Sequence, residues 1–185
     1  MSDNTTRRKV AINIISANIF ALILGGMAGV VFAIAFFLLQ PDWLHRSFSS
    51  VADIFWFLLA MVLGIPIHEG IHGLTWGLVN KGGFHHVSFG VIWKFLTPYC
   101  HYSEPMSRGR YIAGAIMPCL ILGIIPAVAS LFNGNIFWLA FGVIYISGAA
   151  GDLWMTWLML KEPKDAMFLD HPSEAGFYVI EKADK

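Results

Sequence analysis

The sequence predicts an all-α membrane protein with four transmembrane helices and a small β-hairpin between the second and the third. Of its 185 residues, 57% are hydrophobic and 13% are charged, whereas about a quarter of a soluble domain is charged. Four apolar segments are each long enough to cross a bilayer, which takes about 20 residues. A stretch between the second and third segments alternates apolar and polar side chains, as a strand does. A chain of this length forms one compact unit, so we expect a single domain over residues 1–185.

The first span is predicted over residues 10–39, which contain no charged side chain. This run is longer than the roughly 7–15 apolar residues of a signal peptide, and no small-residue cleavage site ends it. Gly25 and Gly29 form a G-x-x-x-G pattern, which lets a neighbouring helix approach closely. A polar stretch with His45 and Arg46 then leads to the second span, predicted over residues 54–79.

The next section, residues 81–110, carries the predicted hairpin. Every second residue is apolar over one stretch, formed by Val87, Phe89, Val91, Trp93 and Phe95. This period of two is typical of a strand, and Thr97-Pro98 predicts a turn before a second strand at residues 99–102. We therefore expect a hairpin at about residues 84–103. Its exposed edge could capture an extended peptide through backbone hydrogen bonds.

Two further spans complete the predicted helices. The third covers residues 111–132, and the Asn133-Gly134-Asn135 turn separates it from the fourth, residues 136–160. The fourth contains a single charged residue, Asp152. Residues 161–185 form a polar tail without a strong periodicity, which we expect to lie in the cytoplasm.

The distribution of charge predicts the orientation, because cytoplasmic loops are enriched in lysine and arginine. The two predicted loops on the opposite side carry Arg46 alone. The basic residues beside the other ends of the spans are Arg7, Arg8, Lys9, Lys81, Lys94, Arg108, Arg110, Lys161 and Lys164. Both termini are therefore predicted to be cytoplasmic. The formal net charge is zero and no basic stripe is present, which argues against nucleic acid as a partner. Cys100 and Cys119 show neither metal-site spacing nor a disulfide framework.

An H-E-x-x-H motif, His68-Glu69-Gly70-Ile71-His72, lies inside the second span. Residues four apart lie on one face of a helix, so both imidazoles can bind one Zn²⁺. Glu69 is rotated to the side, where its carboxylate can take a proton from a water that the metal activates. The alternative is a buried, hydrogen-bonded cluster of these three residues. Ionisable groups are costly to bury in a membrane, which favours a functional site.

Asp152 is the candidate third ligand. In the predicted topology, His68 and His72 lie about 8–12 residues before the cytoplasmic end of the second span, roughly 12–18 Å along it. Asp152 lies about 9 residues before the end of the fourth span, roughly 13 Å along it. Two histidines and one carboxylate at the same depth match a catalytic zinc site, which leaves one position for water. The small residues 147–151 would let the fourth helix pack closely, and the alternative is a structural aspartate.

The membrane-embedded motif, the following hairpin and the later aspartate together resemble the site-2 protease class of intramembrane zinc metalloproteases. More closely, several segments resemble a bacterial family of zincin peptidases of unknown function: residues 68–76, Thr97-Pro98-Tyr99-Cys100 up to Pro105, the Pro118 segment and the Gly151-Asp152 helix. The likeness covers about residues 51–172. It implies a location in the bacterial inner membrane, zinc ligands at His68, His72 and Asp152, and a catalytic carboxylate at Glu69.

The chain departs from the site-2 protease pattern around its third ligand. In that class an Asn-Pro pair often precedes the aspartate and a glycine commonly follows it, whereas Leu153 follows Asp152 here and no Asn-Pro pair precedes it. This leaves the group that stabilises the oxyanion unidentified. No PDZ-like domain is present in the sequence, so substrate selection is expected from the hairpin, the loops or a partner.

The leading expectation is a membrane-embedded zinc metallopeptidase that hydrolyses a peptide bond in or near the bilayer. Its partners would be membrane lipid and a peptide or transmembrane protein substrate. A catalytically inactive, metal-binding membrane scaffold is the first alternative, although such a site does not require Glu69. An ion transporter is the second, although the sequence lacks the internal repeat that transporters often show. His85, His86 and His101 are the reserve ligands if Asp152 is not one, and His171 has no predicted role.

Overall fold

The computed structural model describes residues 5–43, 51–93, 97–171 and 176–182. By its internal contacts the chain forms two compact units. The sheet unit comprises Met1–Ala17, Glu69–Met117 and Asp152–Lys185, and the helical unit comprises Asn18–His68 and Pro118–Gly151. Four residues that entered the predictions from sequence lie outside the described residues: His45, Arg46, Lys94 and Phe95.

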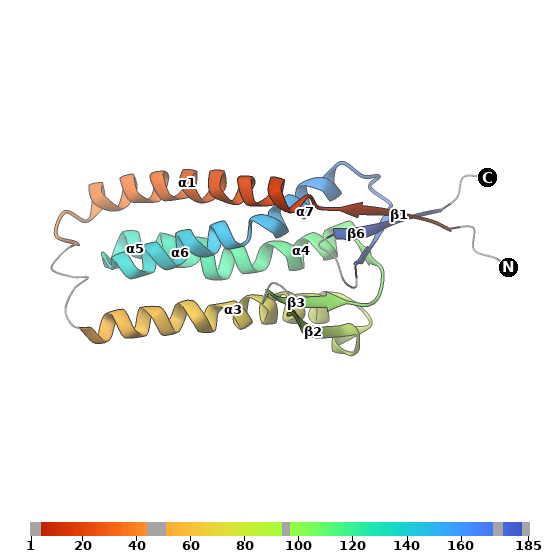
Figure 1. Ribbon diagram of the computed structural model, residues 1–185, viewed down its shortest axis with the longest axis horizontal. Helices are drawn as coiled ribbons and strands as arrows, with labels where there is room; N and C mark the ends of the chain where they lie inside the picture. The colour runs from red at the N-terminus through yellow and green to blue at the C-terminus, as the bar shows by residue number, and fades with distance from the viewer. Residues whose placement is uncertain (1–4, 44–50, 94–96, 172–175, 183–185) are drawn as a thin grey trace. The chain divides into compact units, whose positions relative to one another are not determined.

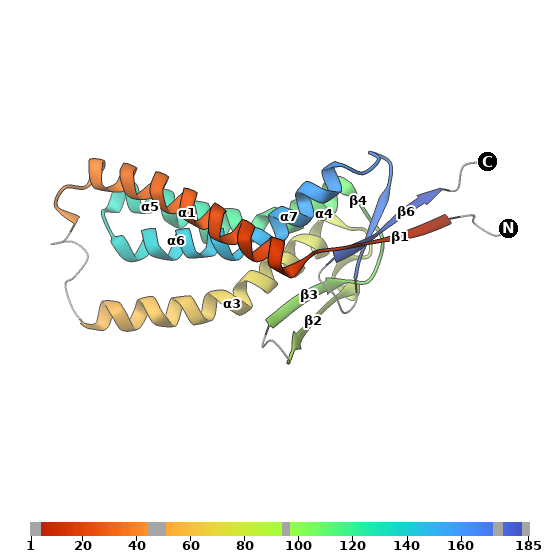
Figure 2. The ribbon, with the colours of Figure 1, turned by 45° about the horizontal axis from the view of Figure 1, so that its top comes forward.

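The sheet unit contains a four-stranded antiparallel sheet that joins the two ends of the chain, with the strand order β1-β6-β5-β4. The strands are β1 (Thr5–Ala11), β4 (Met106–Ser107), β5 (Met167–Asp170) and β6 (Gly176–Lys182). Arg7 is paired with Ile180, and β1 lies beside β6 in both views (Figure 1, Figure 2).

The described chain is mostly helical, as the sequence predicts, but it is not all-α: this four-stranded sheet was not predicted, and two of its strands lie in residues 161–185, which were expected to form a polar tail. Residues 6–9 are exposed and mostly basic, so β1 has no apolar periodicity and is defined by its backbone pairing with β6. In β6, Phe177 and Val179 are buried on one face. Tyr178 between them and Ile180 after them are also hydrophobic, which hides the alternation that marks a half-buried strand.

The second sheet is a hairpin of β2 (Val87–Ile92) and β3 (Thr97–Tyr102), which are antiparallel. A short 3₁₀ helix, Gly83–His86, precedes it. The pairing falls inside the stretch for which the sequence predicts a hairpin. The turn predicted at Thr97-Pro98 is wrong, because Thr97 pairs with Ile92 and Pro98 with Val91. Proline is tolerated near the start of a strand, where a backbone donor is least needed.

One hydrophobic core holds the sheet unit together. Three helices contribute to the unit: the second part of α3 (Val51–Val79), α4 (Arg108–Pro118) and α7 (Ala150–Leu160). The core also draws on β3, β4, β5 and β6, and its buried residues are Trp76, Cys100, Tyr102, Met106, Tyr111, Ala115, Met159, Ala166, Phe168, Phe177 and Val179. The core therefore joins β5 and β6 to the part of α3 that follows His68.

The helical unit contains most of α1 (Ile14–Leu39), the first part of α3, α5 (Ile125–Asn133) and α6 (Ile136–Gly148). A π-helical turn, Cys119–Ile124, leads from α4 into α5. The Ser147 hydroxyl donates to the Ala21 carbonyl at 2.9 Å, and the Tyr145 hydroxyl donates to the Met61 carbonyl at 2.7 Å. A Cβ on Gly25 would lie 2.6 Å from Ser147 Oγ, so the G-x-x-x-G pattern does mark a close approach between α1 and α6.

Three helical stretches in the described part of the chain are long and apolar enough to cross a membrane: Ile15–Leu39, Val51–Val79 and Arg108–Asn133. The pair α6 and α7 passes the same test only together and is bent by 43°. The predicted spans differ in detail. The first helix begins at Ile14 because Val10 and Ala11 belong to β1. The fourth is not one straight helix, because it is interrupted at Ala149.

Candidate metal centre

His68 and His72 lie one turn apart on α3, as the motif predicts. The boundary between the two units falls between His68 and Glu69, and α3 runs through it without a break. His72 is buried and His68 is half-buried. A Cβ on Gly73 would lie 2.6 Å from Phe89 Cζ, so β2 packs on α3 at the residue that follows His72. This glycine allows the hairpin to lie close to the motif.

Asp152 reaches the motif from the first turn of α7. Its Oδ1 lies 3.4 Å from His72 Nε2. One ligand atom each from His68, His72 and Asp152 lies within 4.8 Å of the other two. Within the described residues, no other set of three or more His, Cys, Asp or Glu side chains comes together in this way. The structure thus brings together the three residues that the sequence predicts as ligands.

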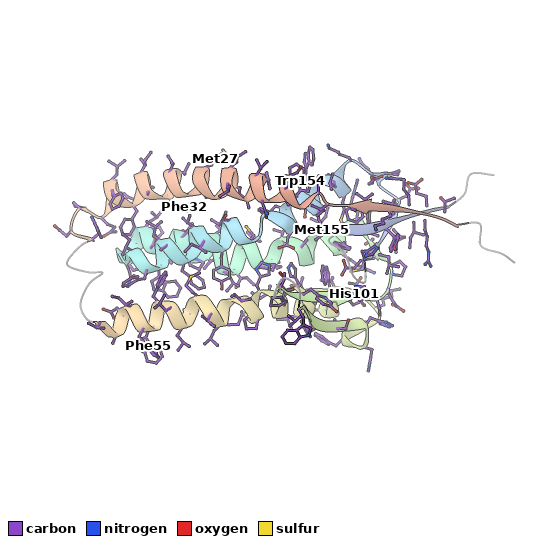
Figure 3. All side chains as sticks on the ribbon, viewed as in Figure 1. Met27, Phe32, Phe55, His101, Trp154 and Met155 are labelled. Atoms are coloured by element: carbon purple, nitrogen blue, oxygen red, sulfur yellow. The ribbon has the colours of Figure 1, made fainter. Side chains whose placement is uncertain are left out.

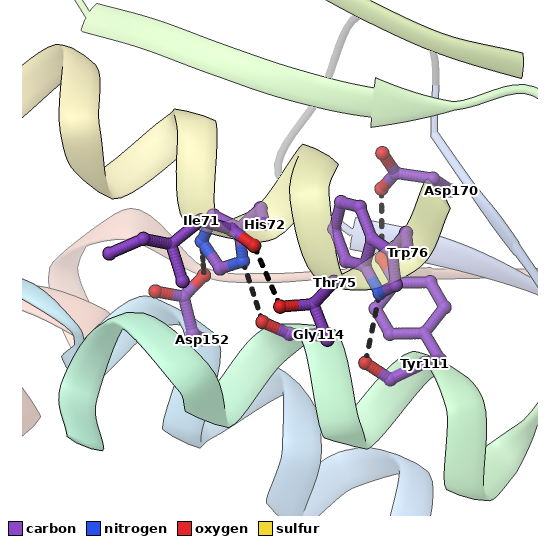
Figure 4. A network of polar contacts seen from close by, with 8 residues as sticks. All are labelled: Ile71, His72, Thr75, Trp76, Tyr111, Gly114, Asp152 and Asp170. Carbon is purple, nitrogen blue, oxygen red and sulfur yellow. Dashed lines mark hydrogen bonds and ion pairs between the residues drawn. The ribbon is translucent and has the colours of Figure 1, made fainter. Parts of the chain in front are cut away.

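The other ring nitrogen of His72 has a fixed partner. Nδ1 lies 2.9 Å from the backbone carbonyl oxygen of Gly114 in α4 (Figure 4). A carbonyl oxygen can only accept, so Nδ1 carries a proton and donates it. In the neutral form that binds a metal, imidazole carries one N–H, so Nε2 then holds the lone pair and faces Asp152. Trp76 also stacks on the His72 ring, with centroids 5.2 Å apart and planes 17° apart.

A chain of buried and partly buried contacts continues from Trp76 through Tyr111 to Asp170 in β5 (Figure 4). Trp76 Nε1 donates to the Tyr111 carbonyl oxygen at 3.2 Å, and the Tyr111 hydroxyl donates to Asp170 Oδ1 at 2.8 Å. Asp170 Oδ2 lies 3.1 Å from Nδ1 of His101, which is labelled in Figure 3. Sequence reasoning did not find these contacts because their residues lie on four separate elements and share no spacing.

Glu69 follows His68 on α3 and is half-buried. Its charge affects strand β3: burial, together with the carboxylates of Glu69 and Asp170, raises the pKa of the Cys100 thiol to about 12. The carboxylate of Glu69 is therefore close enough to β3 to influence the pKa of a side chain there. On a helix, neighbouring side chains are turned about 100° from each other, so Glu69 is offset from the face that carries both histidines.

The remaining histidines have other surroundings. His85 is exposed, and His86 lies 3.3 Å from Glu104 Oε1. His101 pairs with Asp170, as above. The His171 ring stacks on Tyr178, with centroids 5.0 Å apart, which gives this residue a packing role that the sequence did not predict.

The donor set fits zinc. Two imidazole nitrogens and one carboxylate oxygen are a ligand set of catalytic zinc sites. Two ligands that each lie about 2.0–2.1 Å from a tetrahedral metal are roughly 3.3–3.4 Å apart. The observed separation of 3.4 Å between His72 Nε2 and Asp152 Oδ1 matches this value. The Gly114 contact is also typical, because metal-binding histidines usually donate their second ring N–H to an oxygen.

The chain thus has several apolar helices and three residues that could hold a metal ion. The chain belongs to the family described as "Putative zincin peptidase", whose model matches residues 61–167, more than half of the chain. An uncharacterised 24.7 kDa protein of Pyrococcus woesei is 30% identical over 138 residues. That alignment covers 71% of this chain and 59% of the relative, so the chain spans about three-fifths of the relative's length. No solved structure matches the chain significantly.

Proposed function

We propose that this protein is a membrane-embedded zinc metallopeptidase that cleaves a peptide bond in or near the bilayer. The observation that carries the proposal is the convergence of His68, His72 and Asp152 within 4.8 Å, directly beside Glu69. Membership of the zincin family agrees with it. In this proposal the two histidines and the aspartate hold Zn²⁺, and Glu69 is the catalytic carboxylate.

The residues divide the chemistry between them. Bound at this centre, Zn²⁺ supplies a Lewis acid that polarises a carbonyl group and acidifies water. Glu69 takes a proton from the attacking water and can return it to the leaving amine. The Gly114 carbonyl holds the His72 ring so that Nε2 faces Asp152. The ring therefore does not have to reorient when a metal binds. The carboxylate of Asp152 offsets the positive charge that the site gains on binding a metal.

The sheet pairing supports four membrane crossings. Strand β1 precedes α1 and pairs with β6, which follows α7. Paired strands lie on one side of a membrane, so the chain between them must cross it an even number of times. The three long apolar stretches and the bent pair α6–α7 meet this condition when the bent pair is one span. Strand β4 also pairs with β5, so the chain between these two strands, from α4 to α7, must likewise cross an even number of times.

This topology supports the orientation predicted from charge. Both ends of the chain and residues 80–107 then lie on one side, where most of the lysine and arginine residues are found. We propose that this side is the cytoplasm and that the membrane is a bacterial inner membrane. Glu69 and His72 lie in the last part of the candidate span Val51–Val79, the part that this topology places nearer the cytoplasmic side. A peptide or transmembrane protein substrate would accordingly be cut near this surface rather than at the midplane.

The test uses the full chain in liposomes with a library of single-span peptides, and cleavage products are identified by mass spectrometry. Wild type should cleave, and Glu69→Gln should lose cleavage while it keeps its zinc content. Glu104→Gln is the matched control, because Glu104 lies beside His86 and outside the centre. Cleavage by Glu69→Gln at the wild-type rate would overturn the proposal. A wild type that binds zinc and cleaves nothing would instead indicate an inactive metal-binding scaffold.

A further inference from the structure

Among the residues that the structure describes, the Thr156 hydroxyl is one of two buried side-chain groups without a hydrogen-bond partner. The other is the Tyr102 hydroxyl in β3. Thr156 lies in α7 and is 7% exposed. A buried donor without a partner destabilises a fold, so such a group needs an explanation, and a functional role is one of the possible reasons for it.

A threonine inside a helix can satisfy its hydroxyl by donating to the carbonyl four residues earlier. Thr75 in α3 does so, and its Oγ1 donates to the Ile71 carbonyl oxygen at 2.8 Å (Figure 4). The buried Ser130 hydroxyl donates in a similar way, to the Ala127 carbonyl oxygen at 2.6 Å. Thr156 differs from both, because its Oγ1 makes no such bond. Its hydroxyl can therefore donate to another group beside α7.

Thr156 lies one turn after Asp152 on the inner face of α7. Residues four apart are neighbours on a helix surface, with Cβ atoms about 5–6 Å apart. Asp152 contacts His72 at one end of this face, and Met159 joins the core that contains Trp76 at the other end. Helical side chains are tilted towards the start of their helix. The Thr156 side chain therefore leans towards the turn that carries Asp152.

We infer that Thr156 is a positioning residue, whose hydroxyl donates to the Asp152 carboxylate when that carboxylate binds the metal. The inference rests on the zinc centre of the proposed function. Carboxylates that bind a metal are usually held by a further hydrogen bond, and hydrogen bonds to a charged acceptor are stronger than neutral ones. A carboxylate has about four acceptor positions, so Asp152 can accept this bond together with its other contacts.

The other explanation is that Thr156 serves only to pack the core through its methyl group. Valine has nearly the same shape and no hydroxyl, so it would pack there without the cost of a buried donor. The position of the hydroxyl favours a role towards Asp152, because it lies one turn from a carboxylate whose Oδ1 is 3.4 Å from His72 Nε2.

The positioning role has two opposite consequences. Without metal, the hydroxyl is a cost to the fold, so removing it should leave the protein as stable as before or make it more stable. With metal, the hydroxyl supports a ligand. Removing it should weaken zinc binding about tenfold to a hundredfold, which is the usual effect of losing such an outer hydrogen bond. A residue that only packs would show the first effect without the second.

The test measures two properties of the full chain in detergent: the zinc dissociation constant, by competition with a chromogenic chelator, and the thermal unfolding midpoint of the metal-depleted form. Thr156→Val should bind zinc about tenfold to a hundredfold more weakly than wild type, with a midpoint at or above that of wild type. Thr156→Ser keeps the hydroxyl and should keep the wild-type zinc affinity. Thr75→Val is the matched control, because the Thr75 hydroxyl donates within its own helix, and its zinc affinity should be unchanged.

Equal zinc affinities of folded Thr156→Val and wild type would overturn the inference and leave the proposed zinc centre intact. Thr156→Ser binding as weakly as Thr156→Val would also overturn it, because the volume of the side chain and not its hydroxyl would then matter. So would a midpoint of metal-depleted Thr156→Val well below that of wild type, since the hydroxyl would then have a stabilising partner. Thr156→Ala replaces the valine variant in these comparisons if that variant does not fold. A wild type that binds no zinc would overturn the proposed zinc centre itself, and the inference with it.

Discussion

His72 Nδ1 donates a hydrogen bond to the backbone carbonyl of Gly114 at 2.9 Å, which leaves Nε2 to face Asp152. This contact connects α3 to α4 at the level of the candidate metal. It also requires a glycine. A Cβ at position 114 would overlap the indole of Trp76, the same indole that stacks on the His72 ring.

Gly114→Ala should therefore destabilise the protein. Alanine normally favours a helix over glycine by up to about 1 kcal/mol, but the overlap with Trp76 should outweigh this gain, and overpacking costs about 1–3 kcal/mol. The thermal unfolding midpoint in detergent should fall, and zinc affinity should fall with it. Gly109→Ala on the same helix is the control, because a Cβ there meets nothing within 4 Å. Equal midpoints for Gly114→Ala and wild type would contradict this role.

Asp170→Asn tests the far end of the same network. Asp170 accepts from the Tyr111 hydroxyl and lies 3.1 Å from His101 Nδ1, and an amide replaces one accepting oxygen with a donor. We expect a loss of about 1–3 kcal/mol in the free energy of unfolding. Asp165→Asn, at an exposed position, should change little. A stability of Asp170→Asn equal to that of the control would show that the network is not stabilising.

The Cys100 thiol should be inert in the folded protein at neutral pH. Its pKa is raised from 9.0 to about 12, chiefly by burial, and the thiolate is the reactive form. At pH 8 about one thiol in ten thousand would be ionised, against about one in ten for an unperturbed cysteine. In a Cys119→Ala background, iodoacetamide labelling of the native protein should rise about tenfold per pH unit up to about pH 11. Labelling at pH 8 that is as fast in the native as in the denatured protein would refute this.

Membrane topology can be checked with single cysteines in a background without Cys100 and Cys119. Thr6 pairs with Glu181 of β6. The proposed four-span topology places Lys164, which follows α7, on the same side as this pair and Asn133 on the other. An impermeant maleimide should label Thr6→Cys and Lys164→Cys from the same face of sealed vesicles. Asn133→Cys should be labelled from the opposite face. Labelling of Asn133→Cys from the same face as Lys164→Cys would rule out four spans.

Local sequence patterns were sufficient to predict the candidate metal ligands and the first strand of the hairpin. The four-residue spacing of His68 and His72 places both rings on one helix face, and a lone charge in an apolar run marked Asp152. The alternation at residues 87–93 marked the first strand of the hairpin. Each of these signals lies within one element, so it can be recognised without knowledge of the fold.

The features that could not be predicted from the sequence depend mostly on contacts between distant segments. Strand β1 consists mostly of exposed polar residues, and its existence depends on β6, about 170 residues later. Gly114 contributes a backbone carbonyl, and no side chain signals it. Asp170 acts on Tyr111 and His101 from the other end of the chain. The break at Ala149 was hidden because residues 136–160 are apolar on both sides of it.

The most direct test of the metal centre is the zinc content of the purified full chain, measured by mass spectrometry of the metal. Wild type should carry about one zinc per chain, and His72→Ala and Asp152→Ala should each lose it. His85→Ala, which removes an exposed histidine, should keep it. Zinc retained in both His72→Ala and Asp152→Ala, or no zinc in wild type after it has been added back, would contradict the three-ligand centre.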